Sequence, residues 1–249
     1  MTQEGRGRSQ ARRGGPLVDP AQAPAWLSRL IASSGRVDPA MLAAAPPPSE
    51  DSPRPAAVLV LFGEDGGGPG TGPDVLLLRR SDGLTHHPGQ VGFPGGVAEP
   101  EDNGPIEVAL REAAEEVGVL RNGIKPVALL PELYIPRSKF LVTPVLGHWL
   151  NPSPVAPVDF NETAAVARVP LAHLADSTNR FQVRHPSGYV GPAFAVPGML
   201  VWGFTAGLLS SLLSLGGWAE PWDATDVRDL ADAWGDVDSG PTPDGEAGW

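Results

Sequence analysis

The sequence predicts an α/β fold in which helices cover a β-sheet. Three observations lead to this class: apolar, strand-like runs lie on both sides of the centre of the chain, an amphipathic helix separates them, and an apolar helix follows the last run. Strands that are flanked by helices along the chain bury a sheet between helical layers. The chain has 249 residues, 41% of them hydrophobic, which is sufficient for one ample core with appendages.

The N-terminal part differs in composition from the middle of the chain. Residues 1–20 are expected to form a disordered basic tail, because four arginines and several glycines occur there without an apolar pattern. Residues 21–55 are expected to contain a short helix that begins at Pro24, followed by a proline-rich linker that starts near Ala45.

The domain itself is expected over residues 56–216. The runs 56–62 and 75–78 are apolar enough for buried strands. The glycine-rich segment between them is expected to be a hairpin loop, since it lacks the Gly-Lys-Ser/Thr ending of a phosphate-binding P-loop. Further elements are expected later in the domain: strands near residues 126–130, 140–149 and 164–169, and a buried helix near residues 201–215.

The C-terminal part, residues 217–249, is expected to form an acidic tail. A short amphipathic helix that docks on the domain or on a partner is indicated by apolar residues at helical spacing, namely Val227, Leu230, Ala231 and Trp234.

A central helix is expected to run from Pro105 to Val117. Proline suits a first helical position, and Gly118 suits a left-handed stop just after the last turn. Leu110 and Ala113 lie on the apolar face of this helix, and the charged residues lie on other stripes.

Carboxylates are concentrated on one side of this helix. Glu112 and Glu116 are four residues apart and share a stripe, with Glu115 beside them and Arg111 within reach of Glu115. Like charges at this spacing destabilise a helix, and a bound cation would reverse that effect. Mg²⁺ and Mn²⁺ take oxygen ligands, and Mg²⁺ commonly bridges carboxylates to substrate phosphate. The helix therefore predicts a divalent-metal site, with a solvated acidic face as the alternative.

The run from Arg111 to Val119, Arg-Glu-Ala-Ala-Glu-Glu-Val-Gly-Val, resembles the core of the Nudix box. In that box arginine, two apolar positions and three glutamates recur in this order. The general family has a glutamate eight residues before the arginine and a glycine six residues before that. Here one extra residue places Asp102 and Gly96 in these positions, a spacing similar to that of the coenzyme A pyrophosphatase branch.

Other segments resemble the same branch and follow its order. Leu76–Ser81 and His87–Gly96 are similar to the signature that precedes its Nudix box. Two positions depart from the branch: Thr85 stands where arginine is common, and Ala165 stands where an acid is common. The departure at Thr85 bears on the coenzyme A assignment more than on the chemistry. Weaker fragments of the resemblance lie at residues 140–147, 161–171 and 201–207.

The resemblance implies a Nudix-type α/β/α sandwich around a mixed β-sheet. It implies metal-dependent hydrolysis of coenzyme A or acyl-coenzyme A to 3′,5′-ADP and (acyl-)4′-phosphopantetheine, with Mg²⁺ or Mn²⁺ as the cofactor on Glu112, Glu115 and Glu116. The implied catalytic residues are these three glutamates with Arg111 and Glu162, and the alternative for Glu162 is an ordinary loop acid. The implied substrate contacts are Arg80, Ser81, Gly89, Phe93, Pro94, Gly95 and Gly96.

Four of these positions also have structural explanations. Gly95 and Gly96 suit a turn that brings the backbone close to phosphate, where a Cβ would obstruct the approach, or they merely supply a tight turn. Phe93 and Pro94 suit either a pocket wall or packing before a turn.

Arg79, Arg80 and Ser81 are suited to bind substrate phosphate, the arginine through a bidentate fork. Only one arginine can point inward from a strand, and the resemblance favours Arg80; a surface ion pair is the alternative. By the same alternation, the adjacent His86 and His87 face opposite ways, so they are not expected to share a metal ion.

Composition argues against several functions. The chain has 18 basic and 29 acidic residues and a net charge of −11, so no general positive field gathers nucleic acid. The lack of cysteine excludes disulfides and thiol catalysis. No apolar run approaches the roughly 20 residues of a membrane helix, so a cytoplasmic location without membrane contact is expected. A homodimer remains open, because oligomeric state depends on surfaces rather than motifs.

Two alternative functions remain open beside coenzyme A hydrolysis. The same metal helix would serve hydrolysis of ADP-ribose, dinucleotides or nucleoside triphosphates, because pocket shape decides which diphosphate is bound. A non-catalytic nucleotide-binding regulator is the other hypothesis. The intact set of Arg111, Glu112, Glu115 and Glu116 argues against it, since a pure sensor does not need all four.

Overall fold

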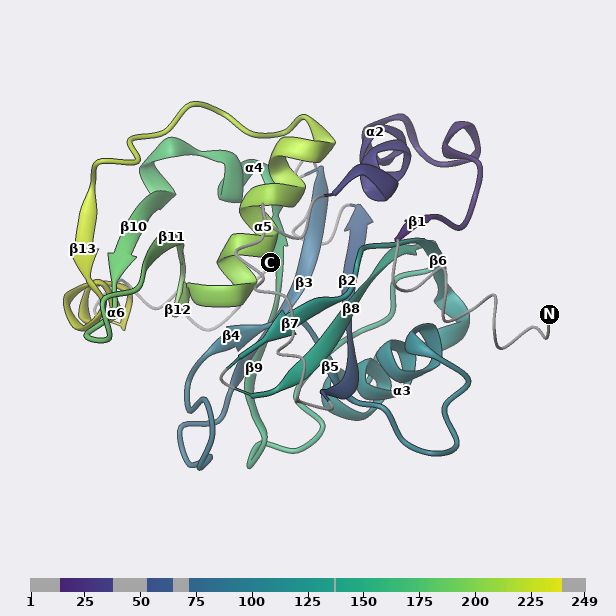
Figure 1. Ribbon diagram of the computed structural model, residues 1–249, viewed down its shortest axis with the longest axis horizontal. Helices are drawn as coiled ribbons and strands as arrows, with labels where there is room; N and C mark the ends of the chain where they lie inside the picture. The colour runs from purple at the N-terminus through teal and green to yellow at the C-terminus, as the bar shows by residue number, and fades with distance from the viewer. Residues whose placement is uncertain (1–13, 38–52, 65–71, 137, 239–249) are drawn as a thin grey trace.

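The computed structural model describes residues 14–37, 53–64, 72–136 and 138–238. Its strands form a large sheet and a smaller one beside it (Figure 1). The large sheet has nine strands, which are β1 (Gly15–Pro16), β2 (Arg54–Glu64), β3 (Pro73–Arg80), β4 (Val91–Gly92), β5 (Gly95–Val97), β6 (Ile124–Leu129), β7 (Leu133–Ile135), β8 (Phe140–Trp149) and β9 (Thr163–Pro170).

The large sheet contains both parallel and antiparallel strand pairs. Its order is β1-β6-β8-β2-β3-β4, with β5 paired to β2, β7 to β8 and β9 to β3. At its centre β2 and β8 run parallel, with Ala57 opposite Thr143. Every other pair recorded in this sheet is antiparallel. The prediction of a mixed sheet is confirmed.

Helices cover both faces of this sheet, as Figure 1 shows. Along β2, Leu59 and Leu61 belong to the core under α3, whereas Val60 and Phe62 belong to the core under α2 and α5. This layering confirms the α/β/α sandwich. None of the helices in the described part of the chain is long and apolar enough to span a membrane. The helices are α2 (Ala25–Ser33), α3 (Pro105–Val117), α4 (Leu171–Ala175), α5 (Gly203–Gly216) and α6 (Leu230–Asp238).

Helix α3 has the boundaries that the sequence predicts. Pro105 takes the first helical position, and Gly118 adopts a left-handed conformation with φ of 70° just past the end. The Gly118 N–H donates to the Ala114 carbonyl at 3.1 Å. At the start of the helix, the Glu107 carboxylate accepts the Asn103 backbone N–H at 2.8 Å. These local interactions explain why a short sequence window is sufficient to place the helix.

The smaller sheet is not predicted from the sequence. Its order is β12-β11-β10-β13, and β13 lies parallel to β10. The predicted C-terminal helix is present as α6 from Leu230, but Val227 lies on β13 instead of on the helix. The strands of this sheet are short, and the pair of β10 with β13 joins segments that are far apart in the sequence. Local sequence patterns therefore do not reveal them. These strands are β10 (Arg180–Arg184), β11 (Val190–Val196), β12 (Met199–Val201) and β13 (Val227–Asp229).

Two predicted boundaries near the N-terminus differ from the structure. Residues 14–20 are placed on the domain instead of forming part of a tail, because β1 pairs with β6, Gly15 opposite Leu129. Arg54 and Pro55 belong to β2 instead of to the linker, since Arg54 N–H donates to the Lys139 carbonyl at 3.1 Å. Three predicted segments lie outside the described residues: the tail at 1–13, the linker at 38–52 and the hairpin loop at 65–71.

Candidate active site

Helix α3 and strand β5 bring Glu116 against the backbone of Gly95. The Gly95 N–H donates to Glu116 Oε2 at 2.9 Å. Burial raises the pKa of Glu116 to about 7, and the charges of Glu112 and Glu162 also raise it, while the Gly95 hydrogen bond and Arg80 lower it. The four ionisable groups therefore lie close enough to influence one another, and Glu116 is the most desolvated carboxylate among them.

Arg111 holds the neighbouring carboxylates in place. Its guanidinium donates to both oxygens of Asp102, at 3.1 and 2.9 Å, and to the Val97 carbonyl at 3.1 Å. It also donates to Glu112 at 2.9 Å and to Glu115 at 3.0 Å, so the predicted Arg111–Glu115 pair is confirmed. The hydrogen bonds from Arg111 to Asp102 lower the pKa of Asp102. Burial nevertheless raises the pKa of Glu112, because desolvation disfavours its charged form.

Glu115 does not join the other two glutamates. Its side chain is 57% exposed, whereas that of Glu112 is 18% exposed. Across the residues that the structure describes, no three histidine, aspartate or glutamate side chains are grouped so as to hold a metal ion. The predicted three-glutamate set is thus present as two inward carboxylates, with Glu115 turned toward Arg111.

Gly95 and Gly96 lie in strand β5 rather than in the predicted turn. The reason for glycine is close packing within the protein. A Cβ on Gly95 would overlap the Ala57 carbonyl and lie 2.7 Å from Val58 Cα, and a Cβ on Gly96 would overlap the Glu112 carboxylate. Both glycines therefore allow β5 to fit between β2 and α3, which places backbone N–H groups beside the glutamates.

Arg80 points toward the glutamates, and Arg79 does not. Arg79 forms the surface ion pair, donating to Asp82 at 2.9 Å. Arg80 Nε is buried and has no hydrogen-bond acceptor among the described residues, while its charge acts on Glu116. The Arg80 backbone N–H donates to the Gln90 carbonyl at 2.9 Å.

Ser81 and Glu162 lie beside each other at the edge of the site. Ser81 N–H donates to the Glu162 carbonyl at 2.9 Å, where β3 and β9 lie side by side. The Glu162 side chain is exposed, and its charge is near enough to raise the pKa of Glu116. The structure thus brings Glu162 close to the Glu116 carboxylate of α3.

Phe93, Pro94 and Gly89 do not lie among the glutamates. Phe93 is 6% exposed and belongs to the hydrophobic core on the α5 side of the sheet, so packing explains it rather than a pocket wall. Pro94 is also buried, and its carbonyl accepts the Leu59 N–H at 2.8 Å. Gly89, with φ of 65°, neighbours Asp82 and Trp234 in the loop between β3 and β4.

Comparison with known proteins assigns the fold. A sequence profile of the NUDIX domain matches residues 52–188, more than half of the chain. The chain belongs to the Nudix family. Uncharacterized Nudix hydrolase NudL of Photorhabdus laumondii is 36% identical over 148 residues, which cover 56% of this chain and 75% of the relative. The protein of that name from Yersinia enterocolitica is 49% identical over 75 residues, 30% of this chain and 38% of its own.

Solved structures of Nudix hydrolases are more distant. The M. smegmatis Nudix hydrolase RenU shares 20% sequence identity, with a TM-score of 0.47 over 68% of this chain and 89% of RenU. The matched Nudix region contains α3 and every residue of the candidate site, from Arg80 to Glu162.

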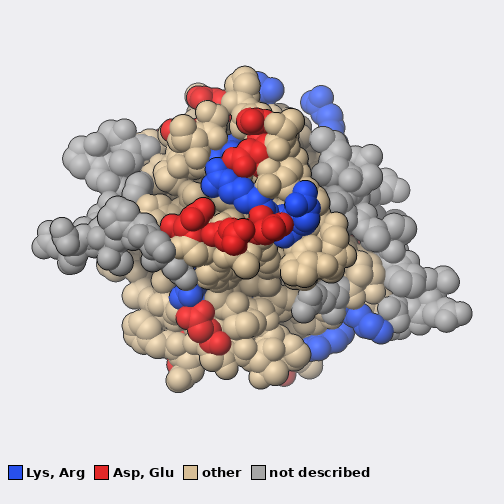
Figure 2. All heavy atoms as spheres, turned by 90° about the vertical axis from the view of Figure 1, so that its left-hand side faces the viewer, with Lys and Arg blue, Asp and Glu red and all other residues tan. Residues whose placement is uncertain are grey.

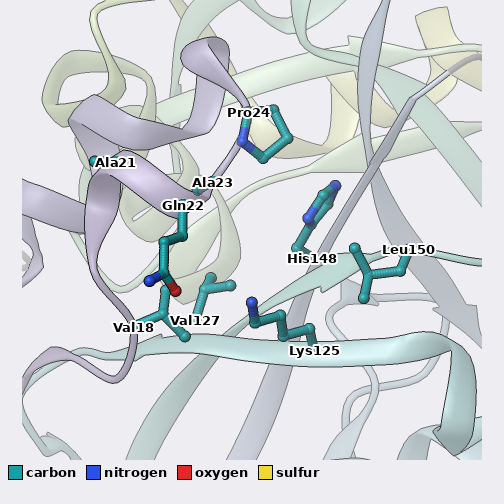
Figure 3. A pocket seen from close by; sticks show the side chains of 9 residues that line it. All are labelled: Val18, Ala21, Gln22, Ala23, Pro24, Lys125, Val127, His148 and Leu150. Atoms are coloured by element: carbon teal, nitrogen blue, oxygen red, sulfur yellow. The ribbon is translucent and has the colours of Figure 1, made fainter.

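A concavity elsewhere on the molecule is separate from the Nudix site. It has a volume of about 310 Å³ and lies between the N-terminal segment and strands β6 and β8, and Gln22, Lys125 and His148 are among its polar lining residues (Figure 3). None of the predicted site residues lines it. Its lining residues are Val18, Ala21, Gln22, Ala23, Pro24, Lys125, Val127, His148 and Leu150.

Two residues that matter in this structure were given no role from the sequence. Asp102 was matched to the Nudix spacing alone, yet its side chain is 4% exposed and accepts the Arg111 fork. Trp234 was assigned to a C-terminal helix, yet its ring lies against Gly89 of the loop next to the site. The sequence signal for Asp102 is an acidic residue at the spacing of the Nudix box. The role of Trp234 depends on a tertiary contact, which no local sequence pattern shows.

Proposed function

We propose that this Nudix protein hydrolyses the diphosphate bond of coenzyme A or acyl-coenzyme A, releasing 3′,5′-ADP and (acyl-)4′-phosphopantetheine. The observation that carries the reaction class is the partly buried carboxylate of Glu116, which accepts the Gly95 N–H and whose pKa is raised to about 7 by burial and by the charge of Glu112. Perturbed carboxylates in such a cluster are typical of functional sites. The substrate rests on the Asp102 and Gly96 spacing and on the signature that resembles the coenzyme A pyrophosphatase branch.

The residues of the site fit Mg²⁺ or Mn²⁺. Glu112 and Glu116 offer only oxygen ligands, and both carboxylates have raised pKa values because burial disfavours their charge. A cation between them would offset that cost. Glu115 is exposed and would complete the set by leaving Arg111, which retains Asp102 and Glu112 as partners. When bound, a divalent ion supplies charge neutralisation at the phosphate oxygens and lowers the pKa of water.

The chain's own groups supply positioning and proton transfer. Arg80, whose Nε lacks an acceptor among the described residues, binds a phosphate oxygen of the substrate. The Gly95 N–H and the Arg111 guanidinium orient Glu116 and Glu112. Glu162 is exposed, and its charge acts on Glu116. It accepts one proton of the attacking water, while the hydroxyl oxygen with the other proton bonds to one phosphorus as the bond from that phosphorus to the bridging oxygen breaks. The leaving phosphate keeps the bridging oxygen, and Glu162 then releases its proton to the leaving phosphate or to solvent.

Product analysis tests this proposal. Purified protein would be incubated with Mg²⁺ or Mn²⁺ and with coenzyme A, ADP-ribose, a dinucleotide or a nucleoside triphosphate, and the products separated by chromatography. Release of 3′,5′-ADP from coenzyme A is expected. Faster turnover of another compound would assign a different substrate to the same chemistry. Binding without turnover of any compound would favour the regulator hypothesis.

The stability of the metal-free protein is expected to fall as pH rises from about 5 to 8. The pKa of Glu116 is raised from 4.5 to about 7, so the folded protein holds this proton more tightly than the unfolded chain. Its contribution is complete below the unfolded value and is lost as pH rises through the folded value. Mg²⁺ should therefore raise Tm more at pH 8 than at pH 6, as thermal unfolding would show. The variant Glu116→Gln should remove the difference, and equal shifts in the wild type would contradict the assignment.

The variant Gly96→Ala is expected to lower kcat by about a hundredfold, because the added Cβ overlaps the Glu112 carboxylate and must displace it. Steady-state kinetics would measure this loss. Gly92→Ala is a matched control, since its Cβ would meet no atom within 4 Å, and kcat should stay within about twofold of wild type. Full activity of Gly96→Ala would show that the position of Glu112 is not needed.

A further inference from the structure

The C-terminal segment of the chain returns to the loop between β3 and β4. Helix α6 packs on the small sheet, where Ala233 is buried with Phe181, Val183 and Leu200, and Trp234 is partly buried at the edge of the same cluster. Figure 1 shows β13 and α6 on the side of the molecule that carries the small sheet. Figure 2 shows this side, on which acidic and basic side chains lie next to one another.

Trp234 contacts the loop at Gly89. A Cβ on Gly89 would lie 3.0 Å from Trp234 Cζ2 and 2.8 Å from Asp82 Oδ1, so the indole ring and the carboxylate both occupy the space that a side chain at this position would need. The Asp82 carboxylate is itself paired with Arg79 at 2.9 Å. Gly89 has φ of 65°, a conformation that glycine adopts without strain. The ring therefore packs against a bend of the loop that has room for glycine alone.

Both ends of the loop are bonded to residues of the candidate site. Next to Gly89, the Gln90 carbonyl accepts the Arg80 N–H at 2.9 Å. At the other end, Ser81 N–H donates to the Glu162 carbonyl at 2.9 Å. These two hydrogen bonds connect the loop to the backbone of the arginine that is proposed to bind phosphate and to the backbone of the glutamate beside α3.

We propose that Trp234 is a positioning residue of the substrate site and that helix α6 belongs to this site. By packing on Gly89, the indole ring fixes the 81–90 loop, and with it the backbone of Arg80, in the shape that receives the substrate diphosphate. This inference rests on the proposed function for the identity of the substrate. The contact itself does not depend on it.

The test compares three variants of the full chain. Trp234→Ala removes the ring, and Trp234→Phe keeps an aromatic ring. Trp222→Ala is the matched control, because Trp222 belongs to the same C-terminal segment but packs against Arg180 instead of the loop. The Arg180 Cζ lies 4.7 Å from the centroid of the Trp222 ring. Each variant is characterised by Tm, by hydrogen–deuterium exchange of the loop amides without substrate, and by steady-state kinetics on the diphosphate that the wild type cleaves.

Trp234→Ala is expected to raise KM about tenfold while kcat changes less than about threefold. Without the ring, the loop becomes ordered only when substrate binds, and the entropy lost in that ordering weakens binding. Its amides at residues 82–90 should exchange faster than in the wild type. Trp234→Phe should restore KM to within about threefold. Trp222→Ala should lower Tm without altering KM or loop exchange.

Two results would overturn the inference. One is unchanged exchange of the loop and unchanged KM in Trp234→Ala, which would leave the ring as packing alone. The other is an equal effect of Trp222→Ala, which would indicate general loss of stability. If the wild type cleaves no diphosphate, the proposed function fails, while the exchange experiment still decides whether Trp234 orders the loop.

Discussion

Replacement of Glu116 by Gln is expected to lower kcat by about a thousandfold or more. The substitution keeps the size of the side chain and removes its charge. Glu116 is the carboxylate whose pKa burial raises most clearly, to about 7, and it is fixed by the Gly95 N–H at 2.9 Å. Glu116 is proposed to hold a divalent cation beside the substrate diphosphate, so loss of its charge would weaken the binding of the cation that neutralises the phosphate oxygens. Single-turnover and steady-state kinetics would measure the effect.

The control for this variant is Glu99→Gln, an identical chemical change at a side chain that is 59% exposed and 4.0 Å from Arg111. Its kcat should stay within about threefold of wild type. The structure also ranks the helix residues: Glu112→Gln should cost more than Glu115→Gln, because only Glu112 faces inward. If Glu116→Gln retained wild-type turnover, Glu116 would not belong to the site.

Replacement of Arg111 by Met is expected to lower the free energy of unfolding by about 2–3 kcal/mol and to reduce activity. The loss leaves Asp102, whose side chain is 4% exposed, without its charged partner. Removing one member of a fully buried ion pair costs about 3–5 kcal/mol. We expect the smaller loss of about 2–3 kcal/mol here because Asp102 is covered by the Arg111 side chain and not by the deep core. Urea unfolding at pH 7 would measure the change. Arg184→Met, which breaks the exposed pair with Asp229, should cost less than about 1 kcal/mol.

The pH dependence of the Arg111 variant has a defined sign. Arg111 lowers the pKa of Asp102 through its hydrogen bonds, so this stabilisation is present above the unfolded pKa of aspartate and is lost as pH falls through the folded value. The difference in unfolding free energy between wild type and Arg111→Met should therefore shrink below about pH 4. A difference that stays constant down to pH 2 would show that the pair contributes through packing alone.

The sequence predicts the elements whose signals are local. The boundaries of α3 follow from Pro105 and Gly118, and the limits of β8 coincide with the strand that is predicted at residues 140–149. The strands that were missed depend on distant partners: β1 is held by β6, and β13 by β10. No pattern within a short window shows such pairings, because isolated short strands are not stable without their neighbours.

The same distinction applies to the site. Helical spacing is sufficient to place Glu112 and Glu116 on one stripe and Arg111 beside Glu115, and the structure agrees. Spacing does not show that Glu115 faces outward. It also does not show that Gly96 makes room for the Glu112 carboxylate instead of for phosphate, because that depends on how β5 packs against α3.

The parallel pairing of β2 with β8 affects how the protein is made. Ala57 faces Thr143, and Leu77 on β3 faces Ala167 on β9, so large stretches of chain are closed by these contacts. Such closure costs entropy before any contact is gained, and it slows folding. As the chain leaves the ribosome, α3 emerges well before β8 and β9. A nascent chain that ends between α3 and β9 carries Glu112 and Glu116 but lacks the strand that follows Glu162. We therefore expect the proposed hydrolysis to begin only after β9 has been translated.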